Sequence, residues 1–177
     1  MDKKLGKRIR QLFKGKLSSE PLSMVRDETA EVPQGCDVYR RDYGSHVVFV
    51  ALIVDPMDDR FTVECAWSTD GKFPAYAMVS RPRDYDSQGI KADEPKDGRF
   101  RFRLCSLWEP SDDTWWRVCS EVSKGFEDIA EEFKSSGLER PATISDSVDD
   151  AVDDAVKKII DFAIPYFETK LGEQIGW

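Results

Sequence analysis

Hydrophobic positions in the first part of the chain recur at helical spacing. Within residues 2–15 the apolar side chains fall three or four residues apart among many Lys and Arg: Leu5, Ile9, Leu12 and Phe13. This spacing predicts a basic amphipathic helix that ends near Gly15. Residues 17–35 contain two Pro and one Gly, so we expect a connection there, with a short helix near Leu22–Arg26 as the alternative.

The middle of the chain changes to the patterns of a sheet. Cys36–Tyr43 predicts a short strand, and Gly44 follows it in a turn. Seven of the nine residues in His46–Val54 are Val, Ile, Leu or Phe, which is typical of a central strand covered on both faces. After a turn at Asp55, apolar and polar residues alternate as far as Trp67, as expected of a half-buried strand.

Two more candidate strands follow, and a polar stretch separates them. Residues 73–80 are one candidate, and Arg99–Leu107 resumes the alternation with Phe100 and Phe102 on one face. Residues 81–98 are polar and contain two Pro and two Gly, which predicts a long loop. Long loops inside compact domains often carry function.

The last third of the chain returns to helical spacing. Residues 115–133 predict one helix, with Gly137 as its stop. Ser145 is expected to cap a second helix, whose apolar stripe covers residues 148–160. Pro165 should kink or end that helix, because proline cannot donate the next backbone hydrogen bond.

The order of these elements predicts the α+β class. Four to five strands joined without intervening helices indicate an antiparallel meander, with helices packed mainly on one face. We expect one N-terminal and two C-terminal helices in a single domain over residues 1–177. Its parts are a basic helix over 1–16, a sheet region over 36–107 with the loop 81–98, and a helical region over 114–171.

The acidic charge of the chain is uneven. The net charge is −8 at pH 7, but residues 1–16 carry seven Lys and Arg against one Asp, a charge of +6, so the remaining residues carry −14. An acidic body repels nucleic acid and anionic membranes, and it suits a basic protein as partner. We therefore expect a basic protein partner, no nucleic acid and no membrane.

Cysteine spacing argues against a metal or redox site. No two of the four share C-x-x-C spacing, so neither a zinc ribbon nor a dithiol site is predicted: Cys36, Cys65, Cys105 and Cys119. The N-terminal run lacks the apolar core of a secretory signal, and no stretch approaches the ~18 apolar residues of a membrane span. We expect a cytoplasmic protein with reduced thiols and no cofactor.

A cluster of aspartates in the last predicted helix has two interpretations: Asp149, Asp150, Asp153 and Asp154. Paired carboxylates at this spacing can bind Mg²⁺. The apolar stripe, however, turns these side chains to water, and negative charge favours a helix N-terminus. We therefore predict no metal site. The four aspartates, together with Glu131 and Glu132, are the candidate contacts for a basic partner.

Three basic residues alternate with aromatic ones in Arg99–Leu107, a composition also found in platforms for single-stranded nucleic acid. Alternation places Arg99, Arg101 and Arg103 on the face opposite Phe100 and Phe102, so they form no joint platform. A solvated arginine face that pairs with carboxylates such as Glu64 is the favoured interpretation.

Catalysis by a thiol would depend on one histidine. A Cys nucleophile needs a base within reach, and His46 is the only histidine. It begins the most apolar strand, while the cysteines follow core patterns, so no catalytic residue is predicted. The basic N-terminal helix has few apolar residues and no lipidation signal, so we expect it to dock on the domain rather than on a membrane.

The order of certain motifs resembles a known family. A basic N-terminal helix precedes the strand motif Val38-Tyr39-Arg40-Arg41, the motif Trp115-Trp116-Arg117-Val118 comes late, and a helix runs into Ile164-Pro165-Tyr166-Phe167. Over roughly residues 3–170 this layout is similar to a bacterial domain-of-unknown-function family of small α+β proteins. Some members resemble immunity proteins that neutralise toxins. The chain departs from that pattern in lacking a Gly-Phe pair after the first helix, and no catalytic residue carries over.

Two function hypotheses remain open. The first is a non-catalytic protein-binding domain, of the kind that an immunity-like inhibitor of a basic toxin represents. The alternative is an enzyme or small-ligand-binding domain with a site under the loop 81–98, where Arg81, Arg83 and Tyr85 lie close together in the sequence. A pocket with converging polar groups would favour the alternative.

Overall fold

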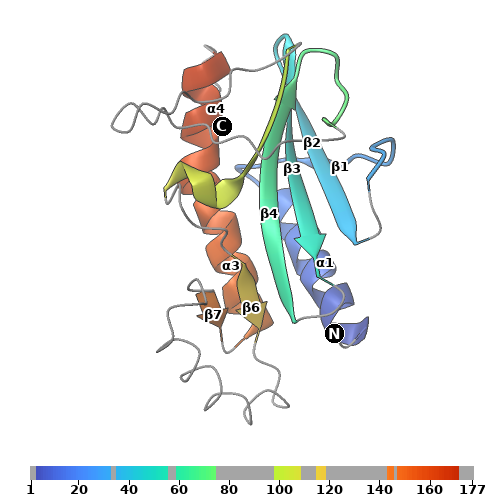
Figure 1. Cartoon of the computed structure of the whole chain (residues 1–177), viewed down its shortest axis with the longest axis vertical. Coiled ribbons are helices and arrows are strands. Elements are labelled where there is room, and N and C mark those ends of the chain that lie inside the picture. The colour runs from blue at the N-terminus through green and yellow to red at the C-terminus, as the bar shows by residue number, and fades with distance from the viewer. Residues whose placement is uncertain are drawn as a thin grey trace, which may run out of the picture.

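A sheet with helices against one face forms the centre of the computed structural model (Figure 1). The structure describes residues 3–32, 35–55, 59–74, 98–108, 115–118, 143–145 and 147–171. The strands follow one another in the order β1-β2-β3-β4-β6-β7, and β5 also pairs with β4. Their bounds are β1 Val25–Arg26, β2 Cys36–Tyr43, β3 His46–Val54, β4 Arg60–Ser68, β5 Arg99–Arg103, β6 Trp116–Val118 and β7 Thr143–Ser145.

The pairing from β1 to β6 is antiparallel throughout, and β6 and β7 are parallel. In the β2–β3 hairpin Tyr43 pairs with His46, which leaves Gly44 and Ser45 as a two-residue turn. Gly44 has a φ of +55°, which a glycine adopts without strain. The predicted α+β class, the antiparallel meander and the central position of β3 are confirmed.

Three helices pack on one face of this sheet. Helix α1 covers Lys3–Leu17, and α3 covers Val148–Lys158. A π-helical turn over Ile159–Ala163 then joins α3 to α4, Ile164–Leu171, so that the C-terminal helices form one continuous rod (Figure 1). The predicted effect of Pro165 is therefore limited. It comes directly after the π-helical turn, in which the backbone N–H of Ile164 donates to the carbonyl of Ile159, and the rod continues beyond it because this turn shifts the hydrogen-bond pattern where the proline lacks an N–H.

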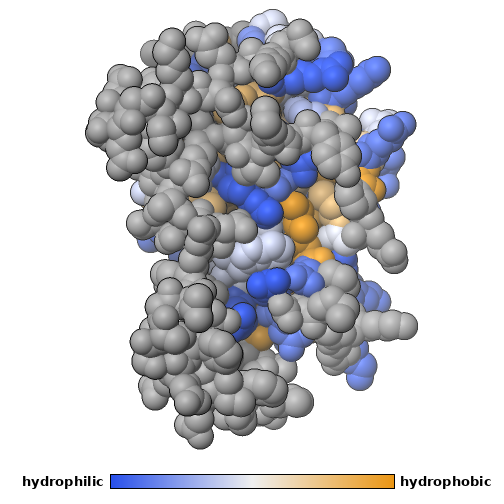
Figure 2. Space-filling model, in the orientation of Figure 1, coloured by the Kyte–Doolittle hydropathy of each residue, from blue (hydrophilic) through white to orange (hydrophobic). Residues whose placement is uncertain are grey.

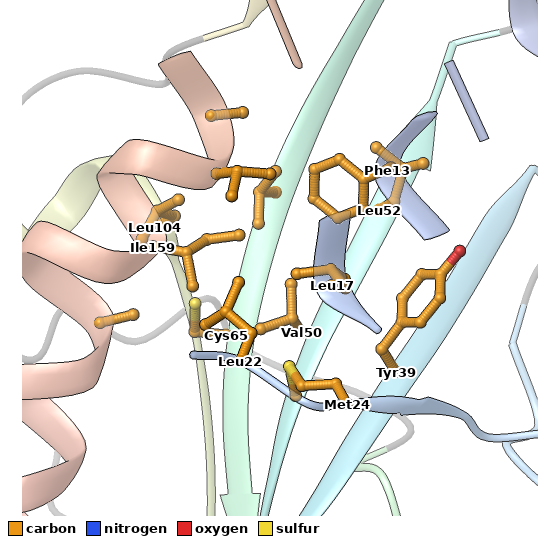
Figure 3. Close-up of a cluster of buried hydrophobic side chains, with 14 of the residues drawn as sticks. Phe13, Leu17, Leu22, Met24, Tyr39, Val50, Leu52, Cys65, Leu104 and Ile159 are labelled. Carbon is orange, nitrogen blue, oxygen red and sulfur yellow. The ribbon is translucent and has the colours of Figure 1, made fainter. Parts of the chain in front are cut away.

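The core between the helices and the sheet is large and aromatic. Ile9, Phe13 and Leu17 of α1 are completely buried, and the ring of Phe13 lies 6.2 Å from Tyr39 and 6.4 Å from Phe61. Figure 3 shows that residues of α1, of the central strands and of the C-terminal rod meet in this core. The burial of Leu17 also explains why α1 continues beyond Gly15, the predicted stop.

Several local predictions were wrong. Trp116–Val118 forms strand β6 instead of the start of a helix, and Trp116 stacks on Phe61 of β4 with ring centroids 5.5 Å apart. The cap of α3 is Ser147, not Ser145, which belongs to β7. In each case a pairing within the sheet decides the local structure. Residues 119–142, the rest of the predicted helix, lie outside the described residues.

Two strand predictions also need correction. The alternation in Arg99–Leu107 continues only to Arg103, and Leu104–Leu107 forms a 3-10 helix. Phe73 and Pro74 are not in a strand, and the remainder of the candidate strand 73–80 lies outside the described residues. Conversely, the two-residue strand β1 falls in the stretch that was expected to be a connection.

We predict that Phe13→Ala destabilises the fold strongly. The ring is completely buried between two other aromatic rings, so its loss should lower the free energy of unfolding by about 3–5 kcal/mol. The matched control is Lys14→Ala, one residue further on and exposed, which should change it by less than about 0.5 kcal/mol. Urea denaturation of both variants checks this, and equal effects would contradict the docking of α1.

Candidate functional site

Two of the aspartates expected to contact a partner lie against the basic helix α1. Arg8 forms an ion pair with Asp149, and Lys16 forms one with Asp153. The carboxylates are 46% and 56% exposed, so these are surface pairs, each worth about 0–1 kcal/mol. Each pair nevertheless places a cation beside a carboxylate that was expected to meet a basic partner.

The other two aspartates differ from each other. Asp154 accepts a hydrogen bond from the indole Nε1 of Trp116 at 2.8 Å. Asp150 is exposed, and its backbone N–H donates to Oγ of the cap residue Ser147 at 3.0 Å. Within the described ranges, Asp150 is the only one of the four predicted aspartates whose carboxylate has neither an ion pair nor a hydrogen bond.

The other predicted site residues lie outside the described residues. They are Glu131 and Glu132 of the expected partner contact, and Arg81, Arg83 and Tyr85 of the alternative ligand site. The loop 81–98 is described only at Gly98, whose carbonyl accepts a hydrogen bond from the backbone N–H of Thr69 at 2.9 Å.

The sheet has a second face, turned away from the three helices. In Figure 1 α1 lies behind β2 and β3, so the near surface of these strands belongs to this second face. Figure 2 shows hydrophobic surface there, bordered by hydrophilic side chains. A small apolar cluster occupies this face: Val38, Phe49, Ala51, Ala66 and Phe73.

Arginines of β5 project onto the second face, as the alternation predicted. Phe100 and Phe102 join the core on the helix side, whereas Arg101 and Arg103 reach Glu64 of β4. Arg103 pairs directly with Glu64 in the β4–β5 ladder, and Arg101 lies opposite Ala66. The predicted pairing of this face with Glu64 is confirmed for Arg101 and Arg103, but the expectation that the arginines are solvated is wrong for these two, whose side chains are largely buried.

Glu64 is the most deeply buried ion-pair partner of the second face. Its side chain is 3% exposed, and those of Arg101 and Arg103 are 12% and 22% exposed. Arg101 donates through Nε to Oε2 at 2.6 Å, and Nε of Arg103 lies 3.3 Å from Oε1. Each carboxylate oxygen therefore has a guanidinium partner, which offsets the cost of burying the charge.

Aromatic rings hold the guanidinium groups of this face in place. Arg101 lies over the ring of Phe73 at 4.7 Å and also donates to the carbonyl of Pro74 at 3.1 Å. Arg103 lies over the ring of Trp115 at 5.4 Å. Contacts between a guanidinium and an aromatic face are favourable, more so when both are shielded from water.

Arg60 extends the arrangement along β4. Its guanidinium lies 4.7 Å from the centre of the Trp115 ring and donates to Asp55 at 2.9 and 3.1 Å. We call Arg60, Arg101 and Arg103 the arginine row. Sequence reasoning missed Phe73 and Trp115, because both lie outside the strands whose alternation revealed the arginines.

Two cysteines of the described part, Cys36 and Cys65, are unsuited to nucleophilic chemistry. Burial raises the pKa of Cys36 to about 11, although Arg101 opposes the shift, and burial raises the pKa of the completely buried Cys65 further. Both thiols therefore stay protonated at neutral pH. Cys65 pairs with Val50, four residues along β3 from His46, which corresponds to about 13 Å along the strand.

His46 has other neighbours. Its Nδ1 lies 3.0 Å from Oγ of Ser45, and its ring meets the edge of Trp67 with centroids 5.5 Å apart. Cys36 pairs with Ile53 near the far end of β3. The structure therefore does not bring His46 together with Cys36 or Cys65 as a base and its nucleophile.

Two further searches cover only the part of the chain that the structure describes. There, no three His, Cys, Asp or Glu side chains gather in a way that could hold a metal ion. In the same ranges, no helix has both the length and the apolar character to cross a membrane.

Comparisons with known proteins add no functional assignment. The sequence matches no family model, and no curated protein and no solved structure matches it. The resemblance to immunity-type proteins therefore stays a hypothesis, and the arginine row is the most highly organised polar arrangement among the described residues.

We predict that Glu64→Gln is far more destabilising than Asp149→Asn. Removal of the Glu64 charge leaves two largely buried guanidinium groups without a counter-charge, which should cost about 3–5 kcal/mol. Asp149 takes part in a surface pair, so its neutralisation should cost at most about 1 kcal/mol. Chemical denaturation at neutral pH compares them, and similar losses would contradict the burial of Glu64.

We predict that Cys36 reacts with iodoacetamide only at high pH. Because its pKa is raised from 9.0 to about 11 in the folded protein, the thiolate should appear mainly above pH 10. Short alkylation pulses on the native protein, read by peptide mass spectrometry, should give a midpoint near pH 11. A midpoint near 9, as in the urea-unfolded control, would show that burial has no effect on this thiol.

Proposed function

We propose that this chain is a non-catalytic protein-binding domain whose partner is a basic protein. The observation that carries the proposal is the charge distribution. Residues 1–16 carry +6 and the remaining residues −14, so the negative charge lies in the chain beyond the basic helix α1. Such a concentration attracts a basic partner over a distance of about a Debye length and speeds their encounter.

The aspartates of α3 contribute less to this attraction than their number suggests. Helix α1 carries seven Lys and Arg and no acidic residue, and it supplies the partners of Asp149 and Asp153. A basic protein that approached α3 would meet these cations as well. We therefore infer that the other two expected contacts, Glu131 and Glu132, matter more for this attraction than Asp149 and Asp153 do.

The chemistry of the described residues supports a role without catalysis. The thiols of Cys36 and Cys65 are held in the protonated form by burial. The charged groups of the second face are engaged with each other, as Glu64 is with Arg101 and Arg103. An immunity-like inhibitor of a basic toxin, acting in the cytoplasm, is the most specific form of the proposal, because a toxin that binds phosphates must itself carry positive charge.

We predict that association with the captured partner depends strongly on salt. Affinity capture from native lysate followed by mass spectrometry identifies the partner, and stopped-flow mixing measures the on-rate. Glu131→Lys with Glu132→Lys should lower that rate about tenfold at low salt, and the difference should shrink towards physiological salt.

The matched control is Asp149→Asn with Asp153→Asn, which removes two carboxylates that are already paired. This variant should keep the on-rate within about twofold. Capture of acidic partners only, or of none, rejects the proposal, and so does an on-rate that does not change with salt.

A further inference from the structure

We propose that the second face of the sheet holds a phosphate-type oxyanion between Arg60 and Arg117, beside Trp115. The proposal concerns a small anionic ligand and does not depend on the proposed basic partner. It starts from the register of β4 and β6, in which Arg60 pairs directly with Arg117. The Cβ atoms of such opposed residues lie about 4.5–5.5 Å apart.

The next pair in the same ladder fixes the direction of both arginines. Phe61 pairs with Trp116, and their rings stack in the core on the helix side with an angle of 12° between them. Because side chains alternate along a strand, Arg60 and Arg117 project together onto the second face. Two like charges opposed in this way destabilise a sheet unless an anion lies between them.

The two arginines of this pair differ in their carboxylate partners among the described residues. Asp55 pairs with Arg60, and Glu64 is shared by Arg101 and Arg103. Arg117 is half-buried, and the part of the chain that the structure describes shows no ion pair or hydrogen bond for its side chain. Among the described residues, Arg60 therefore has a carboxylate partner, whereas Arg117, its direct neighbour in the ladder, has none.

The guanidinium groups are already oriented for an oxyanion. Asp55 and the ring of Trp115 hold Arg60, and the same ring lies under Arg103 at 5.4 Å. Planar guanidinium groups donate two parallel hydrogen bonds to an oxyanion, and a tetrahedral phosphate has enough oxygens to accept from more than one of them. Since Arg60 is already held in place, little conformational entropy is lost on binding.

The test uses the full chain and two probes, inorganic phosphate and phenyl phosphate, each at 10 mM against sodium chloride of equal ionic strength. If the dissociation constant is about 1 mM, phosphate should raise the melting temperature by about 3 °C, whereas chloride should not. A rise with both probes identifies the phosphoryl group as the ligand chemistry. A rise with phenyl phosphate alone identifies an organic phosphate as the source.

The decisive variant is Arg117→Gln. It should abolish the rise caused by the phosphate probe, and in chloride it should raise the melting temperature by about 1–2 °C, because it relieves repulsion by Arg60. The control is Arg99→Gln, which lies on the same face but pairs with Asp70 and should keep the response. If Arg117→Gln does not fold, Arg117→Lys is the second variant. It keeps the charge but lacks the planar guanidinium group, so it should weaken the rise in melting temperature caused by phosphate.

Three results would overturn the proposal. The first is a native chain whose melting temperature rises no more with either phosphate probe than with chloride. The second is an Arg117→Gln variant that keeps the full response. The third is a lower melting temperature of Arg117→Gln in chloride, which would mean that a carboxylate of the chain itself already occupies the position between the two arginines.

Discussion

The buried carboxylate of Glu64 is the interaction on which the arrangement of the sheet depends. Every residue of β4 from Phe61 to Ser68 is buried, and β4 pairs with β3, β5 and β6. A single unpaired charge in such a strand would cost several kcal/mol. Arg101 and Arg103 remove that cost in the observed β4–β5 register, and a shift by one residue would turn them to the helix side. Glu64 therefore links the position of β5 to the stability of the whole sheet.

Ion pairs in this molecule belong to two different physical regimes. The pairs between α1 and α3 are about half exposed, so water and salt screen them and their partners can exchange at low cost. Those of Glu64 are shielded and supported by the rings of Phe73 and Trp115. The first regime neutralises charge at the surface, whereas the second fixes geometry. Consequently the charged groups of the second face are held in fixed positions, whereas those between α1 and α3 are not.

Sequence patterns predicted the strands with a regular run of apolar positions, although β4 is buried on both faces from Phe61 to Ser68 and not half-buried as its alternation predicted. The unbroken apolar run of β3 and the alternation in β4 and β5 follow from the two faces of a strand, and alternation also gave the pairing of Glu64 with the arginines. Contacts between distant residues were not predictable in this way. Strand β6 is only three residues long and exists through its pairing with β4 and β7. The neutralisation of Asp149 by Arg8 joins residues 141 positions apart, which no local pattern reports.

The most direct test of this account is a double-mutant cycle between Glu64 and Arg101. The free energy of unfolding is measured by urea denaturation for the native chain, Glu64→Gln, Arg101→Gln and the double variant. Because the two groups are in direct contact and nearly buried, we expect a coupling energy of about 1–3 kcal/mol. The double variant should therefore lose less stability than the sum of the losses in the two single variants. A coupling energy within about 0.3 kcal/mol of zero would contradict the account, since the two side chains would then contribute independently and Glu64 could not fix the register of the sheet.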